Sequence, residues 1–104
     1  MKGRKPTEEE KDWMDDICQF GCIVCYLEFD GLYTPAVPHH IEGKTKPGAH
    51  FQTIPLCPAH HQTGPYGVAF HQTGKKVWEA EHGSQIALRE RIEQLIFERQ
   101  GVIF

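Results

Sequence analysis

Two short metal-binding patterns constrain the fold of this chain more than any other feature of its sequence. Cys22 and Cys25 form a C-x2-C pair, and Cys57 and His60 form a C-x2-H pair further along the chain. A two-residue spacer lets both side chains of a pair turn toward one ion, so two pairs supply the four ligands of a closed tetrahedral zinc site. Two unrelated pairs of buried cysteines, or a redox-active C-x2-C, are the alternatives. A redox motif needs no second pair, so we predict a structural Zn²⁺ on these four residues.

The fourth zinc ligand is ambiguous because His61 directly follows His60. His60 has the usual two-residue spacing from Cys57, so we prefer it. The remaining cysteine, Cys18, has no partner at such a spacing, and it falls within an expected helix. We therefore interpret Cys18 as a small buried hydrophobic residue.

A zinc site suits a chain of this length. The sequence has 104 residues, which predicts a single domain over 1–104 with a short basic tail at 1–6. A domain of this size buries only about 60–65% of the surface of its unfolded chain, so a metal adds much to its stability. No apolar run reaches the roughly 20 residues of a membrane helix, and the N-terminus lacks the apolar segment of a secretory signal. We expect a cytoplasmic protein without a membrane partner.

The pattern of capping residues and apolar residues predicts helices toward both ends of the chain. Thr7 and Glu10 form a capping box, and apolar residues at helical spacing follow, which predicts a helix over about 8–20. A short helix is expected over 75–82, and Ser84 can cap a last helix after it. The apolar stripe of the last helix consists of Ile86, Leu88, Ile92, Leu95 and Ile96.

The middle of the chain is rich in proline and glycine, so we expect short strands and loops there. Strands are plausible around 39–41 and 53–56. Asp30-Gly31 is a hairpin-type turn, which predicts a pair of strands over 26–34. Together with the terminal helices, this organisation predicts a small α+β domain.

Histidines concentrate in this middle part of the chain. One structural zinc uses one histidine, and five others stand between positions 39 and 71: His39, His40, His50, His61 and His71. Neutral imidazoles bind divalent ions, and an imidazole with a suitable pKa can take a proton from water. We therefore predict a second functional cluster, in which His50 could be a ligand, a supporting residue or a bystander. His82 stands at an expected helix end, where a cation favours the helix dipole, and we interpret it as structural.

The same part of the chain is locally basic although the whole chain carries a net charge of −3. Positions 31 to 78 contain a single acid, Glu42, and four lysines, which are Lys44, Lys46, Lys75 and Lys76. Local potential matters more to a polyanion than the total charge. From charge alone, these lysines could contact phosphates or could simply be solvated.

The order of these residues resembles the HNH endonucleases. The resemblance is carried by Cys22-x2-Cys25, then His39-His40-Ile41, then Gln52 and the run Leu56-Cys57-x2-His60-His61. It implies a ββα-metal core of the treble-clef type, stapled by zinc and flanked here by the N- and C-terminal helices. It also implies hydrolysis of phosphodiester bonds in DNA with Mg²⁺ or Mn²⁺ as the catalytic ion.

The resemblance implies roles for three histidines of the cluster. His40 matches the general base that activates water, and His39 and His61 match ligands of the catalytic metal. The structural zinc falls on the two pairs already described. Gln52 stands where the family has the asparagine that orients the base.

The chain resembles the phage recombination-enhancement, Ref-like nucleases more closely still. This second resemblance covers about residues 10–100, and its motifs are 21–25, 38–41, 53–61, 67–71, Trp78-Glu79 and Gly83. It implies that His71 also belongs to the active site, as a catalytic residue or metal ligand, and that a carboxylate commonly replaces His50. It implies a RecA-type recombinase filament as a partner and the host cytoplasm as the location. The long basic N-terminal arm of those proteins is reduced here to Lys2, Arg4 and Lys5, so dependence on a filament stays open.

Three functions compete at this point. A nuclease needs both the zinc ligands and the second histidine set. A non-catalytic zinc module that binds DNA or protein needs only the zinc ligands, and a decayed nuclease is suggested by Gln52 in place of asparagine. The presence of His39, His40, His61 and His71 together favours the nuclease.

Overall fold

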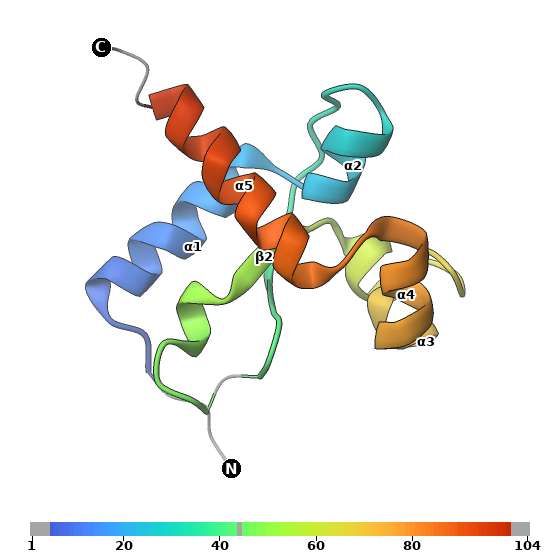
Figure 1. Cartoon of the computed structure of the whole chain (residues 1–104), viewed down its shortest axis with the longest axis horizontal. Coiled ribbons are helices and arrows are strands. Elements are labelled where there is room, and N and C mark those ends of the chain that lie inside the picture. The colour runs from blue at the N-terminus through green and yellow to red at the C-terminus, as the bar shows by residue number, and fades with distance from the viewer. Residues whose placement is uncertain (1–4, 44, 101–104) are drawn as a thin grey trace.

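Helices surround a small two-stranded sheet in the computed structural model of this protein (Figure 1). The structure describes residues 5–43 and 45–100, so Lys44, Lys2 and Arg4 lie outside the described residues. The elements in chain order are α1 (Glu8–Phe20), α2 (Ile23–Glu28), β1 (Val37–His40), the 3₁₀ turn η1 (Ala49–Phe51), β2 (Thr53–Leu56), the π-helical turn η2 (Ala59–Thr63), α3 (Phe70–Thr73), α4 (Lys75–His82) and α5 (Gln85–Gln100).

The two strands pair antiparallel at the centre of the molecule. Val37 faces Leu56, and His40 faces Thr53, which sets the register. Every residue of β2 is buried, and α1, α2 and α5 all contact this strand. The predicted strands and the α+β class are confirmed, and a zinc-stapled ββα core is consistent with this arrangement and its Cys3His cluster.

The hairpin expected over 26–34 is wrong. Residues 23–28 form α2 instead, and no strand follows it in the described residues 29–36. The cause is local, because the Sγ of Cys22 accepts a hydrogen bond from the backbone N–H of Cys25 at 3.5 Å and caps a helical turn. Asp30 and Gly31 do turn the chain, with φ of 55° and 88°. The first cysteine pair therefore starts a helix, and the turn ends it.

Helix α1 begins and packs as its sequence predicts. The side chain of Thr7 accepts from the backbone N–H of Glu10 at 3.2 Å, and the Glu10 carboxylate accepts from the Thr7 N–H at 2.8 Å. Ile17 is fully buried in the core. Trp13 Nε1 donates to Thr53 Oγ1 at 2.9 Å, which ties α1 to β2. Cys18 packs against the core but is only partly buried.

Helix α5 buries a narrower stripe than expected. Leu88, Ile92 and Ile96 are buried, and Ser84 caps the helix by accepting from the Ala87 N–H at 3.0 Å. Ile86 was expected in the stripe but is exposed. The buried residue of the first turn is Gln85, because this end of α5 lies over polar partners rather than the apolar core.

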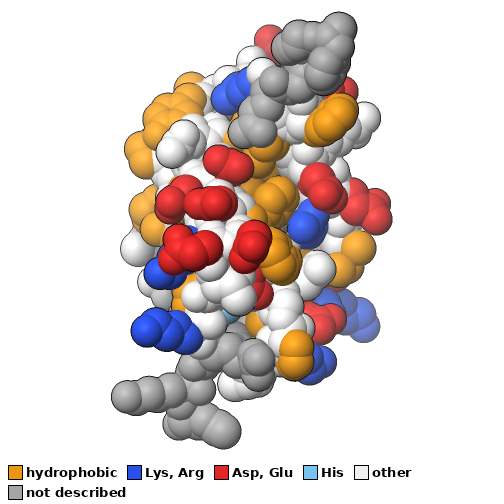
Figure 2. Space-filling model, turned by 90° about the vertical axis from the view of Figure 1, so that its left-hand side faces the viewer, with side chains coloured by type: hydrophobic (Ala, Val, Ile, Leu, Met, Phe, Trp, Pro, Cys, Tyr) orange, Lys and Arg blue, Asp and Glu red, His pale blue; other side chains and the backbone are white. Residues whose placement is uncertain are grey.

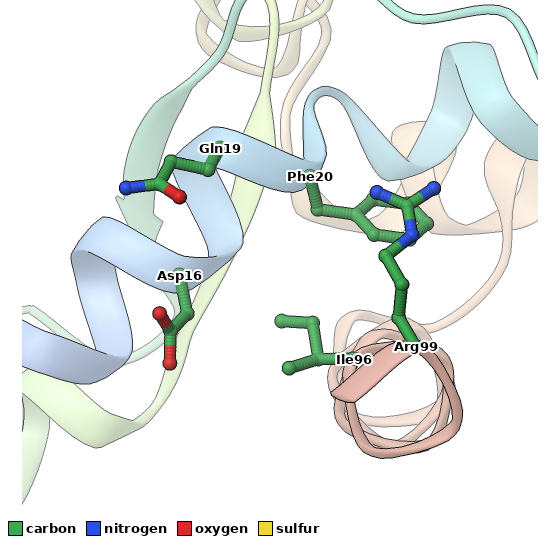
Figure 3. Close-up of a pocket in the computed structure, with 5 residues that line it drawn as sticks. All are labelled: Asp16, Gln19, Phe20, Ile96 and Arg99. Atoms are coloured by element: carbon green, nitrogen blue, oxygen red, sulfur yellow. The ribbon is translucent and has the colours of Figure 1, made fainter. Parts of the chain in front are cut away.

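The C-terminal ends of α1 and α5 meet at a pocket. Figure 3 shows Arg99 of α5 reaching across to Phe20 of α1, and its guanidinium lies 4.4 Å from the ring centroid. Asp16, Gln19 and Ile96 complete the lining. The contact is a cation–π interaction that closes this end of the core.

The charged surface is uneven. Figure 2 views the molecule from the side on which α1 lies in Figure 1, and acidic side chains gather on this face. Helix α1 carries four exposed acidic residues, which are Glu8, Glu9, Asp12 and Asp15. A polyanion such as DNA is repelled by such a face. No helix of the described residues is long and apolar enough to cross a membrane.

Candidate functional site

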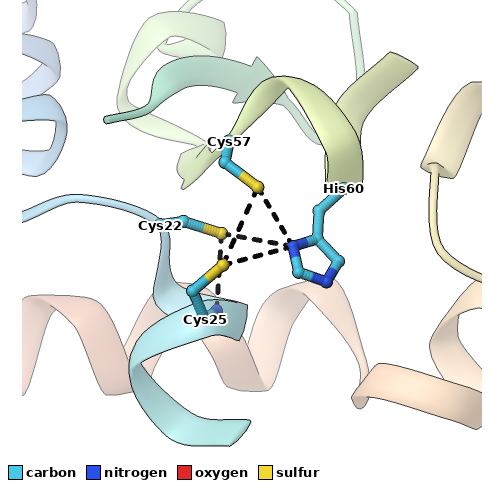
Figure 4. A group of neighbouring side chains, drawn as sticks. All are labelled: Cys22, Cys25, Cys57 and His60. Carbon is cyan, nitrogen blue, oxygen red and sulfur yellow. Dashed lines mark hydrogen bonds between the residues drawn. The ribbon is translucent and has the colours of Figure 1, made fainter. Parts of the chain in front are cut away.

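The first cluster brings together the two pairs that the sequence singled out, as Figure 4 shows. Cys25 Sγ lies 3.8 Å from Cys57 Sγ, and His60 Nδ1 lies 3.6 Å from the sulfurs of Cys22 and Cys25 and 3.2 Å from that of Cys57. Tetrahedral zinc would separate two sulfurs by about 3.8 Å and a sulfur from a nitrogen by about 3.5 Å, from the usual bond lengths. Most of the distances fit one tetrahedral ion.

Three elements position these ligands in the interior. Cys22 and Cys25 stand at the start of α2, Cys57 follows β2, and His60 lies in η2. All four side chains are buried. Burial raises the pKa of the Cys22 thiol to about 12, so a metal that binds there must displace protons. Burial lowers the pKa of His60, which keeps its imidazole in the neutral form that binds metal. The cluster can hold a structural metal such as zinc, with His60 rather than His61 as the fourth member.

His82 packs beside this cluster. Its ring centroid lies 5.4 Å from that of His60. Its Nε2 donates to the carbonyl of Gly67 at 2.9 Å, and its Nδ1 lies 2.8 Å from Oε2 of Glu28. His82 therefore joins α4 to the loop before α3 and to α2. The sequence suggested only that the dipole of the helix end favours His82. The structure adds the carboxylate of Glu28 as a direct partner.

A second cluster lies at the other side of η2. His39 of β1, His61 of η2 and His71 of α3 offer ligand atoms that all lie within 4.8 Å of one another. Nε2 of His61 and Nε2 of His71 are 3.2 Å apart. His39 is buried, His61 is partly buried and His71 is exposed. They line a hollow of about 330 Å³, whose other lining residues are Pro38, His40, Gly43 and Gln62.

His39 is the most enclosed member of this cluster. Its ring centroid lies 4.5 Å from that of Phe70, and its Nε2 lies 2.7 Å from Oε1 of Gln85. Burial lowers the pKa of His39, while the hydrogen bond with Gln85 opposes that shift. The lowered pKa keeps His39 neutral and able to bind a cation at neutral pH. Sequence reasoning missed Gln85, because a polar residue in a first helical turn usually faces solvent.

His40 also lines the hollow, and His50 lies behind it. Nε2 of His40 and Nδ1 of His50 are 2.9 Å apart, and the side chain of His50 is buried in η1. His50 is thus a direct neighbour of His40, and its role as ligand, supporting residue or bystander stays a prediction.

Gln52 is placed elsewhere. Its side chain is exposed and lines a separate groove with Ile86, Arg89, Glu90 and Glu93. Its backbone carbonyl accepts from the Ile41 N–H at 2.9 Å, which extends the pairing of the two strands. The structure therefore does not bring the Gln52 side chain into the lining of the histidine hollow.

The described lysines of the expected DNA surface are all exposed. Lys46 lies 3.5 Å from the carboxylate of Glu42. Lys75 and Lys76 begin α4, directly after the helix that carries His71. Lys75 and Lys76 therefore stand close in sequence to His71, which lines the hollow. Lys46 is already paired with Glu42.

One comparison with known proteins bears on most of the chain. Residues 6–96 match the family model described as "Recombination enhancement, RecA-dependent nuclease". The match spans both clusters and all the elements that carry them.

Proposed function

Because the chain belongs to the family of recombination-enhancement, RecA-dependent nucleases, we propose that it is a metal-dependent DNA endonuclease of the HNH type. The hollow lined by His39, His40, His61 and His71 is its active site. The observation that carries this proposal is the convergence of three histidine ligand atoms within 4.8 Å beside a further histidine. A purely structural zinc module needs no such second cluster.

His39, His61 and His71 would hold the catalytic cation. Three imidazoles leave coordination positions for water and phosphate oxygens, as catalytic sites require. Nitrogen ligands favour a transition metal over Mg²⁺, which prefers oxygen, so Mn²⁺ fits this set better than Mg²⁺. A cation bound there would stabilise the charge that develops on the scissile phosphate and the leaving oxygen.

His40 is the proposed general base. Its hydrogen bond with His50 fixes the orientation of the ring. If Nε2 of His40 carries the proton and donates it to Nδ1 of His50, then Nδ1 of His40 is the nitrogen that accepts a proton from the attacking water. In this proposal His50 takes over the orienting role that the family resemblance gives to Gln52.

DNA would reach the hollow from the side of α3 and α4. Lys75 and Lys76 are exposed there and would contact phosphates without reading bases. Lys46 would contribute less because Glu42 pairs with it, and Lys44 stays a sequence-based candidate. The acidic face of α1 would be turned away from the nucleic acid. A RecA-type filament on the DNA is the proposed partner.

A plasmid-nicking assay tests the function. Wild-type protein, His40→Ala and Gln94→Ala, an exposed position on α5, would each be assayed with Mn²⁺ and Mg²⁺, with and without a RecA filament. We expect cleavage by wild type and Gln94→Ala and its loss in His40→Ala. Binding of DNA without cleavage under every condition would support a non-catalytic zinc module and overturn the nuclease.

A further inference from the structure

A buried chain of hydrogen bonds leads from the proposed metal site into α4. Oε1 of Gln85 lies 2.7 Å from Nε2 of His39. On its other side, Nε2 of Gln85 donates to Oε2 of Glu79 at 3.1 Å, and the backbone N–H of Gln85 donates to the same oxygen at 2.9 Å. Gln85 has no exposed surface, and Glu79 is partly buried.

The chemistry of these groups fixes which one donates and which one accepts in each hydrogen bond. An ionised carboxylate only accepts hydrogen bonds, so of the two ends of the Gln85 side-chain amide only the NH₂ group can hydrogen-bond to Glu79. That choice turns the amide oxygen of Gln85 toward His39. An amide oxygen also only accepts, so the proton of the neutral His39 imidazole must sit on Nε2. Nδ1 of His39 is then left as the nitrogen with a lone pair.

We infer that Glu79 and Gln85 are positioning residues that set the tautomer of His39 and make Nδ1 its metal-binding atom. This inference rests on the proposed function for the use of the site, but the tautomer itself does not depend on it. Histidine ligands of metals commonly donate their other N–H to such a partner, and loss of the partner lowers metal affinity by about 10–100-fold. Glu79 does not contact the cation but acts on it through the amide of Gln85 and then through His39.

Three variants separate the parts of this chain. Gln85→Leu removes the oxygen that accepts from His39 and puts an apolar side chain of similar size in the same buried place. Glu79→Gln lets the amide of Gln85 rotate, because an amide at position 79 can donate as well as accept. The double substitution Glu79→Gln with Gln85→Glu exchanges the two groups. It reverses the hydrogen bond between positions 79 and 85, but a carboxylate at position 85 still accepts from Nε2–H of His39.

The experiment uses the full-length, zinc-loaded protein labelled with ¹⁵N. Long-range ¹H–¹⁵N spectra at mildly alkaline pH report which nitrogen of His39 carries the proton, and His39→Gln assigns the signals. Mn²⁺ binding is followed in parallel by the electron paramagnetic resonance of the free ion. Zinc content and melting temperature confirm that each variant is folded, and Gln94→Leu on the exposed side of α5 is the matched control.

We expect the Nε2–H tautomer in wild type, Gln94→Leu and the double variant. Glu79→Gln and Gln85→Leu should show a mixed or reversed tautomer, with Mn²⁺ bound about 10–100-fold more weakly. The inference is overturned if wild-type His39 carries its proton on Nδ1, or if folded Glu79→Gln and Gln85→Leu keep both the wild-type tautomer and the wild-type Mn²⁺ affinity. The expected tautomers and affinities in a protein that never cleaves DNA would leave this inference standing and reject only the nuclease proposal.

Discussion

The two clusters of this protein both contain histidine but place it in different surroundings. The Cys3His cluster has four buried ligands and is closed, whereas the cluster of His39, His61 and His71 runs from a buried to an exposed side chain beside a hollow. Four protein ligands are typical of structural zinc, and three with an open side are typical of catalytic metals. Burial and ligand number, rather than the presence of histidine, separate the two.

The clusters are also joined through one turn of the chain. His60 and His61 are neighbours in η2, and each belongs to a different cluster. The N–H of His61 donates to the Cys57 carbonyl at 2.9 Å, so the turn is tied to a zinc-cluster residue. A metal that orders the first cluster would therefore also hold His61 of the second cluster in place.

Removal of the structural metal should have the largest effect. Cys57→Ser, or a strong chelator, removes metal-linked stabilisation on the order of 10 kcal/mol and should leave the middle of the chain unfolded. Circular dichroism, melting temperature and zinc content measure this. His71→Ala should keep both the fold and the zinc, because His71 is exposed. If Cys57→Ser keeps its zinc and melting temperature, the structural assignment is wrong.

Loss of the proposed general base should have the next largest effect. We expect His40→Ala to keep the fold, the zinc and DNA binding while its cleavage rate falls by about 10²–10⁴-fold. The neighbouring variant His39→Ala should instead weaken Mn²⁺ binding, so that added Mn²⁺ partly restores cleavage. The opposite pattern, with a metal-rescued His40→Ala and an inactive His39→Ala at every Mn²⁺ concentration, would exchange the two roles.

Acidification should lower the free energy of unfolding by a smaller amount, through the two buried histidines His39 and His60. Burial lowers the pKa of His39 and of His60, so the unfolded chain takes up their protons first. Stability is therefore fully present above the ordinary imidazole pKa of about 6.5 and is lost as the pH falls from there through the lowered pKa of the folded state.

Denaturant unfolding at a series of pH values and constant free zinc would measure this loss. His39→Gln should show a shallower decline than wild type, since one of the two histidines no longer contributes. A free energy of unfolding that rises as the pH falls below 6.5 would contradict the direction given by burial.

The smallest effect is expected at Gln52. Its side chain lies in a groove with Arg89 rather than in the lining of the histidine hollow. Gln52→Ala should therefore cleave DNA at close to the wild-type rate in the nicking assay. A loss comparable to that of His40→Ala would show that Gln52 reaches the reacting groups and would restore the role that the family resemblance implies.

The amino-acid sequence alone determined the features that depend on neighbours along the chain. The spacing of Cys22 and Cys25, the capping box at Thr7 and the cap at Ser84 all operate within one turn, so they could be predicted. The two strands were also predictable, because helix-breaking prolines and glycines surround them. Even here a local effect was missed, since the sulfur of Cys22 starts α2 where a hairpin was expected.

Only the tertiary structure decided which distant side chains meet. His39 of β1 and Gln85 in the first turn of α5 become partners across the fold, and Gln85 is buried there in place of Ile86. In the same way the register of β1 on β2 and the turn η1 bring His50 to His40, while the side chain of Gln52 leaves the sheet on another side. Such contacts depend on how elements pack against one another, and the order of residues along the chain does not encode that packing in a form that local patterns reveal.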